Sequence, residues 1–145
     1  MLRPSSIRPS REESNLTLRE VLHAHIPTLT LESTVRDAVD KMDVYQFPAL
    51  VVVNDQMLPI GVLTEGDLCR AVSQRDNLTS MSGEPAHIYM SVDPTTMKAE
   101  EEIGEAFHRM LNSGLTLLPV VDEGRLAGIV LRIDLMQAML LDATS

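Results

Sequence analysis

The stretch that decides the fold runs from Leu117 to Leu135 and reads LLPVVDEGRLAGIVLRIDL. Thr116–Val121 is an apolar run with β-branched side chains, which is typical of a buried strand. Asp122-Glu123-Gly124 predicts a tight turn, and Leu126–Leu131 is expected to form the returning strand. Arg132–Leu141 is expected to be a helix. The order strand, turn, strand, helix is the unit from which the rest of the chain can be interpreted.

The same order of elements occurs earlier in the chain, so the sequence contains an internal repeat. Residues 68 apart match in the first part of each repeat, and residues 67 apart match in the second part. The matched pairs include Thr28 with Thr96, Ala38 with Ala106, Met42 with Met110, Val53 with Val120, Gly61 with Gly128 and Asp67 with Asp134. One extra residue between Met42 and Val53 accounts for the change, because loops tolerate single insertions.

Each repeat is expected to read strand, helix, strand, strand, helix. In the first repeat the expected elements are Thr28–Leu31, a helix from Val35 capped by Ser33 or Thr34, Ala49–Val53, Ile60–Thr64 and Glu65–Val72. In the second they are Thr95–Lys98, a helix over Ile103–Leu111 ended by Gly114, Thr116–Val121, Leu126–Leu131 and Arg132–Leu141.

We expect an α/β (α+β) fold in which two repeated β-α-β-β-α units pack sheet to sheet with pseudo-twofold symmetry. Three strands with one apolar face need a partner, so neither unit is expected to be stable alone. The predicted organisation is a flexible tail over residues 1–16, unit one over 17–76, a linker over 77–85, unit two over 86–141 and a tail over 142–145. Short segments, Leu18–Leu22 and Ala86–Met90, precede the two units.

Composition argues against several classes of function. The formal net charge is −9 and only four residues are aromatic, so the chain is not expected to bind nucleic acid. No apolar run reaches membrane-spanning length and residues 1–15 contain no signal-peptide core, so we expect a cytoplasmic protein without a membrane partner. The single cysteine, Cys69, is expected to be a buried, inert thiol on the inward side of its helix. The histidines His23, His25, His87 and His108 are scattered, so no metal site is expected.

Two segments resemble the cystathionine-β-synthase (CBS) domain family. The first is Leu117–Val130, which is followed by the pair Asp134-Leu135. The second is Gly61–Leu68, which ends in the pair Asp67-Leu68. The resemblance covers about residues 17–141. It implies a Bateman module, a tandem pair of CBS domains that usually forms a homodimer and commonly binds AMP, ADP or ATP between its two units. Such modules are regulatory, so the resemblance also implies a non-enzymatic protein that signals to an unknown effector protein.

The family signature is a Ser or Thr at the end of the third strand and an Asp three residues later, which Thr64 and Asp67 match. The implied chemistry is an Asp carboxylate that accepts from both ribose hydroxyls and a Thr hydroxyl that donates to phosphate. The start of the following helix adds backbone N–H groups, and Gly66 leaves room for close approach. The alternative is that Thr64 and Asp67 only cap this helix.

By the same resemblance, the cleft that contains Thr64 and Asp67 is completed by Pro94, Thr96, Leu118 and Pro119, with Thr96 on the base or ribose. Leu118 is equally interpretable as a core residue. The second cleft departs from the pattern, because Leu131 stands where the hydroxyl should be. Its expected members are Asp134, Arg132, Thr28 and Val51, and we expect it to bind more weakly or to be empty.

Two hypotheses therefore remain open. The first is a regulatory module that binds an adenine nucleotide, and the second is a ligand-free dimeric scaffold in which binding has decayed. An enzyme is not expected, because the sequence shows neither a nucleophile paired with a base nor a glycine-rich phosphate loop.

Overall fold

The computed structural model describes residues 16–75 and 77–144, except for the side chains of residues 143 and 144. The chain divides into two compact units. His25–Thr95 together with Gly124–Leu126 form one, called here the first-repeat unit. The described residues up to Ala24, Thr96–Glu123 and those from Ala127 onward form the second-repeat unit. The expected N-terminal tail lies outside the described residues except for Leu16.

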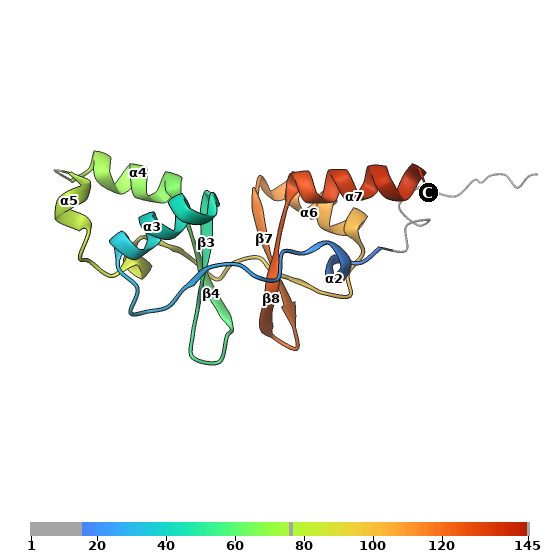
Figure 1. Ribbon diagram of the computed structural model, residues 1–145, viewed down its shortest axis with the longest axis horizontal. Coiled ribbons are helices and arrows are strands. Elements are labelled where there is room, and N and C mark those ends of the chain that lie inside the picture. Colours follow the sequence, from blue (N-terminus) through green and yellow to red (C-terminus); the bar gives the residue numbers. More distant parts are fainter. Residues whose placement is uncertain (1–15, 76, 145) are drawn as a thin grey trace, which may run out of the picture. The chain divides into compact units, whose positions relative to one another are not determined.

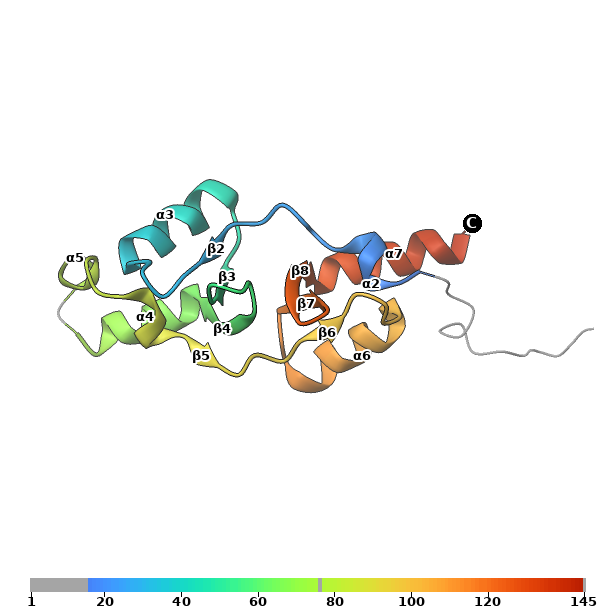
Figure 2. The ribbon, with the colours of Figure 1, turned by 90° about the horizontal axis from the view of Figure 1, so that it is seen from below.

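The first-repeat unit contains a four-stranded sheet in the order β2-β3-β4-β5. The strands are β2 (Thr28–Leu29), β3 (Ala49–Val53), β4 (Pro59–Thr64) and β5 (Ser91–Val92). β2 pairs parallel with β3, and the other pairs are antiparallel. The helices are α3 (Val35–Tyr45), α4 (Glu65–Ser73), α5 (Leu78–Met81) and the 3₁₀ turn η1 (Ala86–Tyr89). α3 and α4 lie on the same side of the β3–β4 pair (Figures 1 and 2).

The start of α3 follows directly from its sequence. The hydroxyl of Thr34 accepts a hydrogen bond from the backbone N–H of Asp37 at 3.1 Å, and the Asp37 carboxylate accepts from the Thr34 N–H at 2.9 Å. This reciprocal capping box satisfies two N–H groups that a helix start otherwise leaves unpaired. Val35 and Ala38 then bury the inward side of the helix. The predicted cap and helix are confirmed.

The second-repeat unit repeats this arrangement with a three-stranded sheet in the order β6-β7-β8. Its elements are β6 (Met97–Lys98), α6 (Ile103–Ser113), β7 (Leu117–Asp122), β8 (Arg125–Leu131), α7 (Arg132–Thr144) and, from the start of the chain, α2 (Leu18–Val21). Gly114 ends α6 at φ 69°, as predicted. The turn between β7 and β8 places Glu123 and Gly124 at φ 53° and 81°, which suits a two-residue hairpin turn.

The segments that precede the repeats cross over between the units. Leu18 of α2 comes before the first repeat in sequence, yet it is fully buried in the core of the second-repeat unit. His23 pairs with Ile129 of β8 in the same unit. η1 and β5 come before the second repeat, yet they pack in the first-repeat unit, where β5 is the edge strand beside β4. Each unit therefore takes its edge segment from the other repeat.

Three further features differ from the sequence predictions. The predicted linker, residues 77–85, contains α5, whose Met81 is fully buried in the core of the first-repeat unit. α7 continues to Thr144, beyond the predicted end at Leu141 and into the segment expected to be a tail. β2 is shorter than the predicted strand Thr28–Leu31 because the chain turns at Leu31 and Glu32.

Most of the buried residues form two clusters, one in each unit. Leu29, Leu50, Leu63 and Met81 belong to the cluster of the first-repeat unit. Leu18, Ile103, Leu118 and Leu135 belong to the cluster of the second-repeat unit. Within residues 16–75 and 77–144, no helix combines the length and apolar character needed to cross a bilayer.

Candidate functional site

The predicted pair Thr64 and Asp67 lies where β4 passes into α4. Thr64 is the last residue of β4 and the N-cap of α4. Its hydroxyl accepts from the Asp67 N–H at 3.0 Å, and Oδ2 of Asp67 accepts from the Thr64 N–H at 2.8 Å. The capping role that the sequence left open is therefore confirmed.

The cap leaves part of both side chains available for other contacts. The Thr64 hydroxyl uses an oxygen lone pair in the cap, so its proton remains to be donated. Oδ1 of Asp67 accepts from Arg70 at 2.5 Å, and the Arg70 side chain is 71% exposed whereas that of Asp67 is 10% exposed. An exposed ion pair of this kind contributes about 0–1 kcal/mol, so a competing donor can replace Arg70 at small cost.

Gly66 lies between the two residues and leaves space beside them. A Cβ placed on Gly66 would lie 3.6 Å from both the Thr64 hydroxyl and the Arg70 guanidinium, which is ordinary contact distance. Gly66 is therefore not required by crowding within this chain.

The other residues predicted for this site come from both units. Pro94 belongs to the first-repeat unit. In β5, Ser91 pairs with Val62 and Val92 pairs with Gly61, so the chain after β5 runs away from Thr64. Thr96, Leu118 and Pro119 belong to the second-repeat unit. Leu118 is 0% exposed and part of the core there, so the structure supports the core interpretation of its side chain.

A residue that the sequence analysis missed is Ser91. It is exposed on β5, opposite Val62 and therefore next to the strand end that carries Thr64. The repeat itself contained the signal, because the 68-residue spacing aligns Ser91 with His23, which pairs with β8 in the same way. Ser91 adds a hydroxyl near the capped end of β4.

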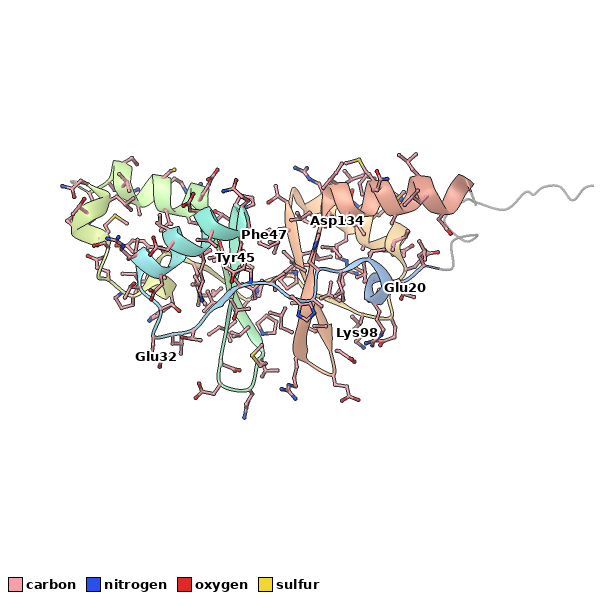
Figure 3. The ribbon with its side chains drawn as sticks, viewed as in Figure 1. Glu20, Glu32, Tyr45, Phe47, Lys98 and Asp134 are labelled. Atoms are coloured by element: carbon pink, nitrogen blue, oxygen red, sulfur yellow. The ribbon has the colours of Figure 1, made fainter. Side chains whose placement is uncertain are left out.

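The equivalent strand end in the second-repeat unit is built differently. Oδ2 of Asp134 accepts from the Leu131 N–H at 2.8 Å and also lies 2.8 Å from Nε2 of His23. The side chains of His23 and Asp134 are 43% and 20% exposed. Figure 3 shows Asp134 where β8 passes into α7. This carboxylate therefore already has two partners from its own unit.

The remaining residues predicted for the second site come from both units. Arg132 is exposed at the start of α7 in the second-repeat unit. Thr28 and Val51 are register partners in the first-repeat unit, where the Thr28 carbonyl accepts from Nζ of Lys41 at 2.7 Å. Val51 is 1% exposed but is not part of the buried cluster formed by Leu50 and Val52.

A groove of about 770 Å³ lies between α3 and α4 of the first-repeat unit. Its apolar lining includes Val39, Met42, Phe47, Leu68 and Val72, and its charged lining residues are Asp43 and Glu65. Cys69 also lines this groove and is exposed. The prediction of a buried thiol is therefore wrong, because Leu68 and Ala71 supply the inward side of α4 instead. Among the described residues, no cluster of three or more His, Cys, Asp or Glu side chains is placed to hold a metal ion.

Comparison with known proteins identifies the fold and the family. The family model of the CBS domain matches residues 18–74 and 86–141. An uncharacterized 17.7 kDa protein of Acidianus ambivalens is 33% identical over 108 residues, which cover 74% of this chain and 63% of that relative. The chain thus spans less than two thirds of the length of this relative.

Solved structures show the same fold. The crystal structure of CBSX2 in complex with AMP matches with a TM-score of 0.75 and 23% identity, covering 86% of this chain and 96% of that chain. A CBS-domain containing protein from Agrobacterium tumefaciens matches with a TM-score of 0.74 and 20% identity, covering 85% and 98%. Together with the repeated two-sheet α+β architecture, the two family matches in tandem show that the chain belongs to the CBS domain family, as a regulatory CBS pair.

Proposed function

We propose that this CBS pair is a non-enzymatic sensor that binds an adenine nucleotide (AMP, ADP or ATP) at the end of β4. The observation that carries the proposal is the Thr64–Asp67 pair, in which a partly accessible carboxylate and a hydroxyl proton meet at the start of α4. The AMP complex of CBSX2, a protein with the same fold, supports this choice of ligand.

Each group at this strand end has a distinct role in the proposed complex. Asp67 accepts hydrogen bonds from the ribose hydroxyls after Arg70 turns away, and Thr64 donates to a phosphate oxygen. Arg70 is then free to pair with phosphate, since its side chain is long and exposed. The contributions of Pro94, Thr96, Leu118 and Pro119 stay predictions from the family resemblance.

The strand end at Asp134 is proposed to bind more weakly. Leu131 offers no hydroxyl, and a sugar would have to displace His23 from the Asp134 carboxylate. Arg132 remains a candidate for phosphate at this end, with Thr28 and Val51 as predicted neighbours.

The proposed module works as a cytoplasmic homodimer that signals to an effector protein. Nucleotide binding shifts the conformation or the dimer only by as much as the nucleotide prefers one state over the other. The competing function is a ligand-free dimeric scaffold. The capping box favours that alternative, because it accounts for Thr64 and Asp67 without any ligand.

Thermal-shift titrations with AMP, ADP, ATP and S-adenosylmethionine separate the two functions. A nucleotide at 100 times its dissociation constant stabilises the folded protein by about 2.7 kcal/mol. The wild type should gain stability with at least one adenine nucleotide. Absence of a shift with all four compounds would support the scaffold.

Asp67→Ala is the decisive variant, and Asp37→Ala is its matched control. Both substitutions remove the same capping box, at α4 and α3 respectively, but only Asp67 belongs to the proposed site. We expect both to lower the melting temperature and only Asp67→Ala to abolish the nucleotide shift. The Asp134→Ala variant should keep most of the nucleotide shift. Equal loss of the shift in Asp67→Ala and Asp37→Ala would show that the cap, not the carboxylate, matters.

A further inference from the structure

The side chain of Arg70, in the second turn of α4, reaches back to the strand end that carries Thr64 and Asp67. Nη2 of Arg70 donates to Oδ1 of Asp67 at 2.5 Å. Nη1 lies beside Gly66, 3.6 Å from the point that a Cβ on this glycine would occupy, and the Thr64 hydroxyl oxygen lies 3.6 Å from the same point. The guanidinium therefore fills space beside Gly66 that the carboxylate and the hydroxyl also border.

This position suits a cation only while an anion holds it there. The first turn of a helix carries a partial positive charge, which favours anions and disfavours a guanidinium. The Asp67 carboxylate offsets that effect through its contact with Arg70. The Asp67 side chain is largely buried whereas the Arg70 side chain is largely exposed, so the guanidinium can leave the carboxylate without disturbing the core. Arg70 is thus a movable cover on a largely buried acid.

The second repeat has no arginine at this position. At the 67-residue spacing, Gln137 of α7 stands where α4 has Arg70. Gln137 is exposed, and the equivalent carboxylate, Asp134, pairs with His23 instead. The repeated fold therefore accepts a glutamine here, and helix packing does not require the arginine of the first repeat.

We infer that Arg70 is a specificity-determining residue of the proposed nucleotide site, where it selects adenosine compounds that carry phosphate. The inference rests on the proposed function and names the class of its ligand. A ribose diol that approaches Oδ1 of Asp67 competes with the guanidinium for the same oxygen. After displacement, a ligand with phosphate offers the guanidinium a new anion, whereas a ligand without phosphate offers it none.

The two steps act differently on ligands with and without phosphate. Displacement of Arg70 from Asp67 weakens the binding of every adenosine compound by the same factor. The new contact between Arg70 and phosphate strengthens the binding of AMP, ADP and ATP but not that of adenosine. Hydrogen bonds between two charged groups are about twice as strong as neutral ones, so the second step outweighs the first for the phosphorylated ligands. The wild type should therefore bind ATP more tightly than adenosine.

Titration calorimetry of Arg70→Gln with adenosine and with ATP measures the two steps separately. The affinity for adenosine should rise by up to about fivefold, because an exposed ion pair is a weak competitor. The ratio of the ATP affinity to the adenosine affinity should fall about tenfold, because displacement affects both ligands equally and only the phosphate contact remains in the ratio. Arg70→Lys keeps the charge, so its ratio should lie between those of wild type and Arg70→Gln.

Arg36→Gln is the matched control. Arg36 is an exposed arginine of α3 that pairs with Asp40 of the same helix, so its replacement changes the net charge by the same amount. At physiological ionic strength this variant should keep the wild-type ratio, because distant exposed charges are screened. An equal fall of the ratio in Arg36→Gln and Arg70→Gln would overturn the inference, since net charge rather than the place of Arg70 would then set the preference.

Failure of the inference can be distinguished from failure of the proposed function. If wild type binds ATP and Asp67→Ala abolishes that binding, but Arg70→Gln leaves the adenosine and ATP affinities unchanged, the site stands and the inferred role of Arg70 is wrong. If wild type binds none of adenosine, AMP, ADP and ATP, the proposed function itself is wrong and the inference falls with it.

Discussion

At the scale of single residues, the two equivalent acids of the repeat have different partners. Asp67 pairs with Arg70 of its own helix, whereas Asp134 pairs with His23 from the start of the chain. The Arg70 contact is local and exposed, but the His23 contact depends on a backbone pairing with Ile129. The two strand ends are therefore chemically unequal although the acids match in sequence.

Glu84 is a residue whose titration should be visible in stability. It accepts hydrogen bonds from Arg75, at 2.5 and 3.2 Å, and from the Tyr89 hydroxyl. The Arg75 hydrogen bonds, and then the Tyr89 hydroxyl, lower the pKa of Glu84 from its ordinary value of 4.5. A lowered pKa means that the stabilisation is complete above the unfolded-state pKa and is lost as pH falls through the folded-state pKa.

We therefore expect Glu84→Gln to lower the melting temperature at pH 7. The difference from wild type should shrink as pH falls below about 4.5, because wild type loses the same charge. Calorimetry from pH 3 to pH 8 measures this, with Glu32→Gln on the exposed turn before α3 as the control. A difference that stays constant with pH would mean that Glu84 contributes by packing rather than by charge.

At the scale of elements, each crossing segment packs against a glycine, and the two glycines occupy the same position in the repeat. A Cβ on Gly128 would lie 2.3 Å from the backbone oxygen of His23, and a Cβ on Gly61 would lie 2.3 Å from Sδ of Met90. The first contact involves backbone that is hydrogen-bonded to Ile129, whereas the second involves a flexible side chain. Absence of a side chain is thus required at Gly128, whereas at Gly61 the side chain of Met90 can shift.

Alanine substitutions should rank these positions. Gly128→Ala should destabilise by about 1–3 kcal/mol because the backbone of the edge segment must move. Gly61→Ala should cost less because Met90 can change rotamer, and Gly83→Ala, whose Cβ would meet nothing within 4 Å, should be tolerated. Urea unfolding of the three variants measures the order. A Gly83→Ala variant as unstable as Gly128→Ala would contradict this explanation.

At the scale of the whole molecule, the packing leaves the single cysteine of the sequence open to solvent. Cys69 is exposed and lines the groove between α3 and α4. The thiol should therefore react with a soluble disulfide reagent in the folded protein, without denaturant, and the Cys69→Ser variant should give no reaction. A thiol that reacts only after the protein is unfolded would contradict this placement of Cys69.

The sequence by itself determined the repeat, the order of its elements, the capped start of α3 and the glycine end of α6. These features depend on residues within a few positions of each other, so local patterns report them. β3 begins and ends at the predicted residues for the same reason. The Thr64–Asp67 pair was also visible in sequence, and its capping geometry is a local one.

Only the tertiary structure decided which segments pack together. The crossing of α2 and β5 between units, the contact of His23 with Asp134, the buried Met81 and the exposed Cys69 all depend on residues distant in sequence. In α4, Leu68, Cys69 and Val72 are all apolar, so the helical period alone does not determine which side of the helix faces the sheet. The sheet selects Leu68 and Ala71, and the groove beside Cys69 follows from that selection.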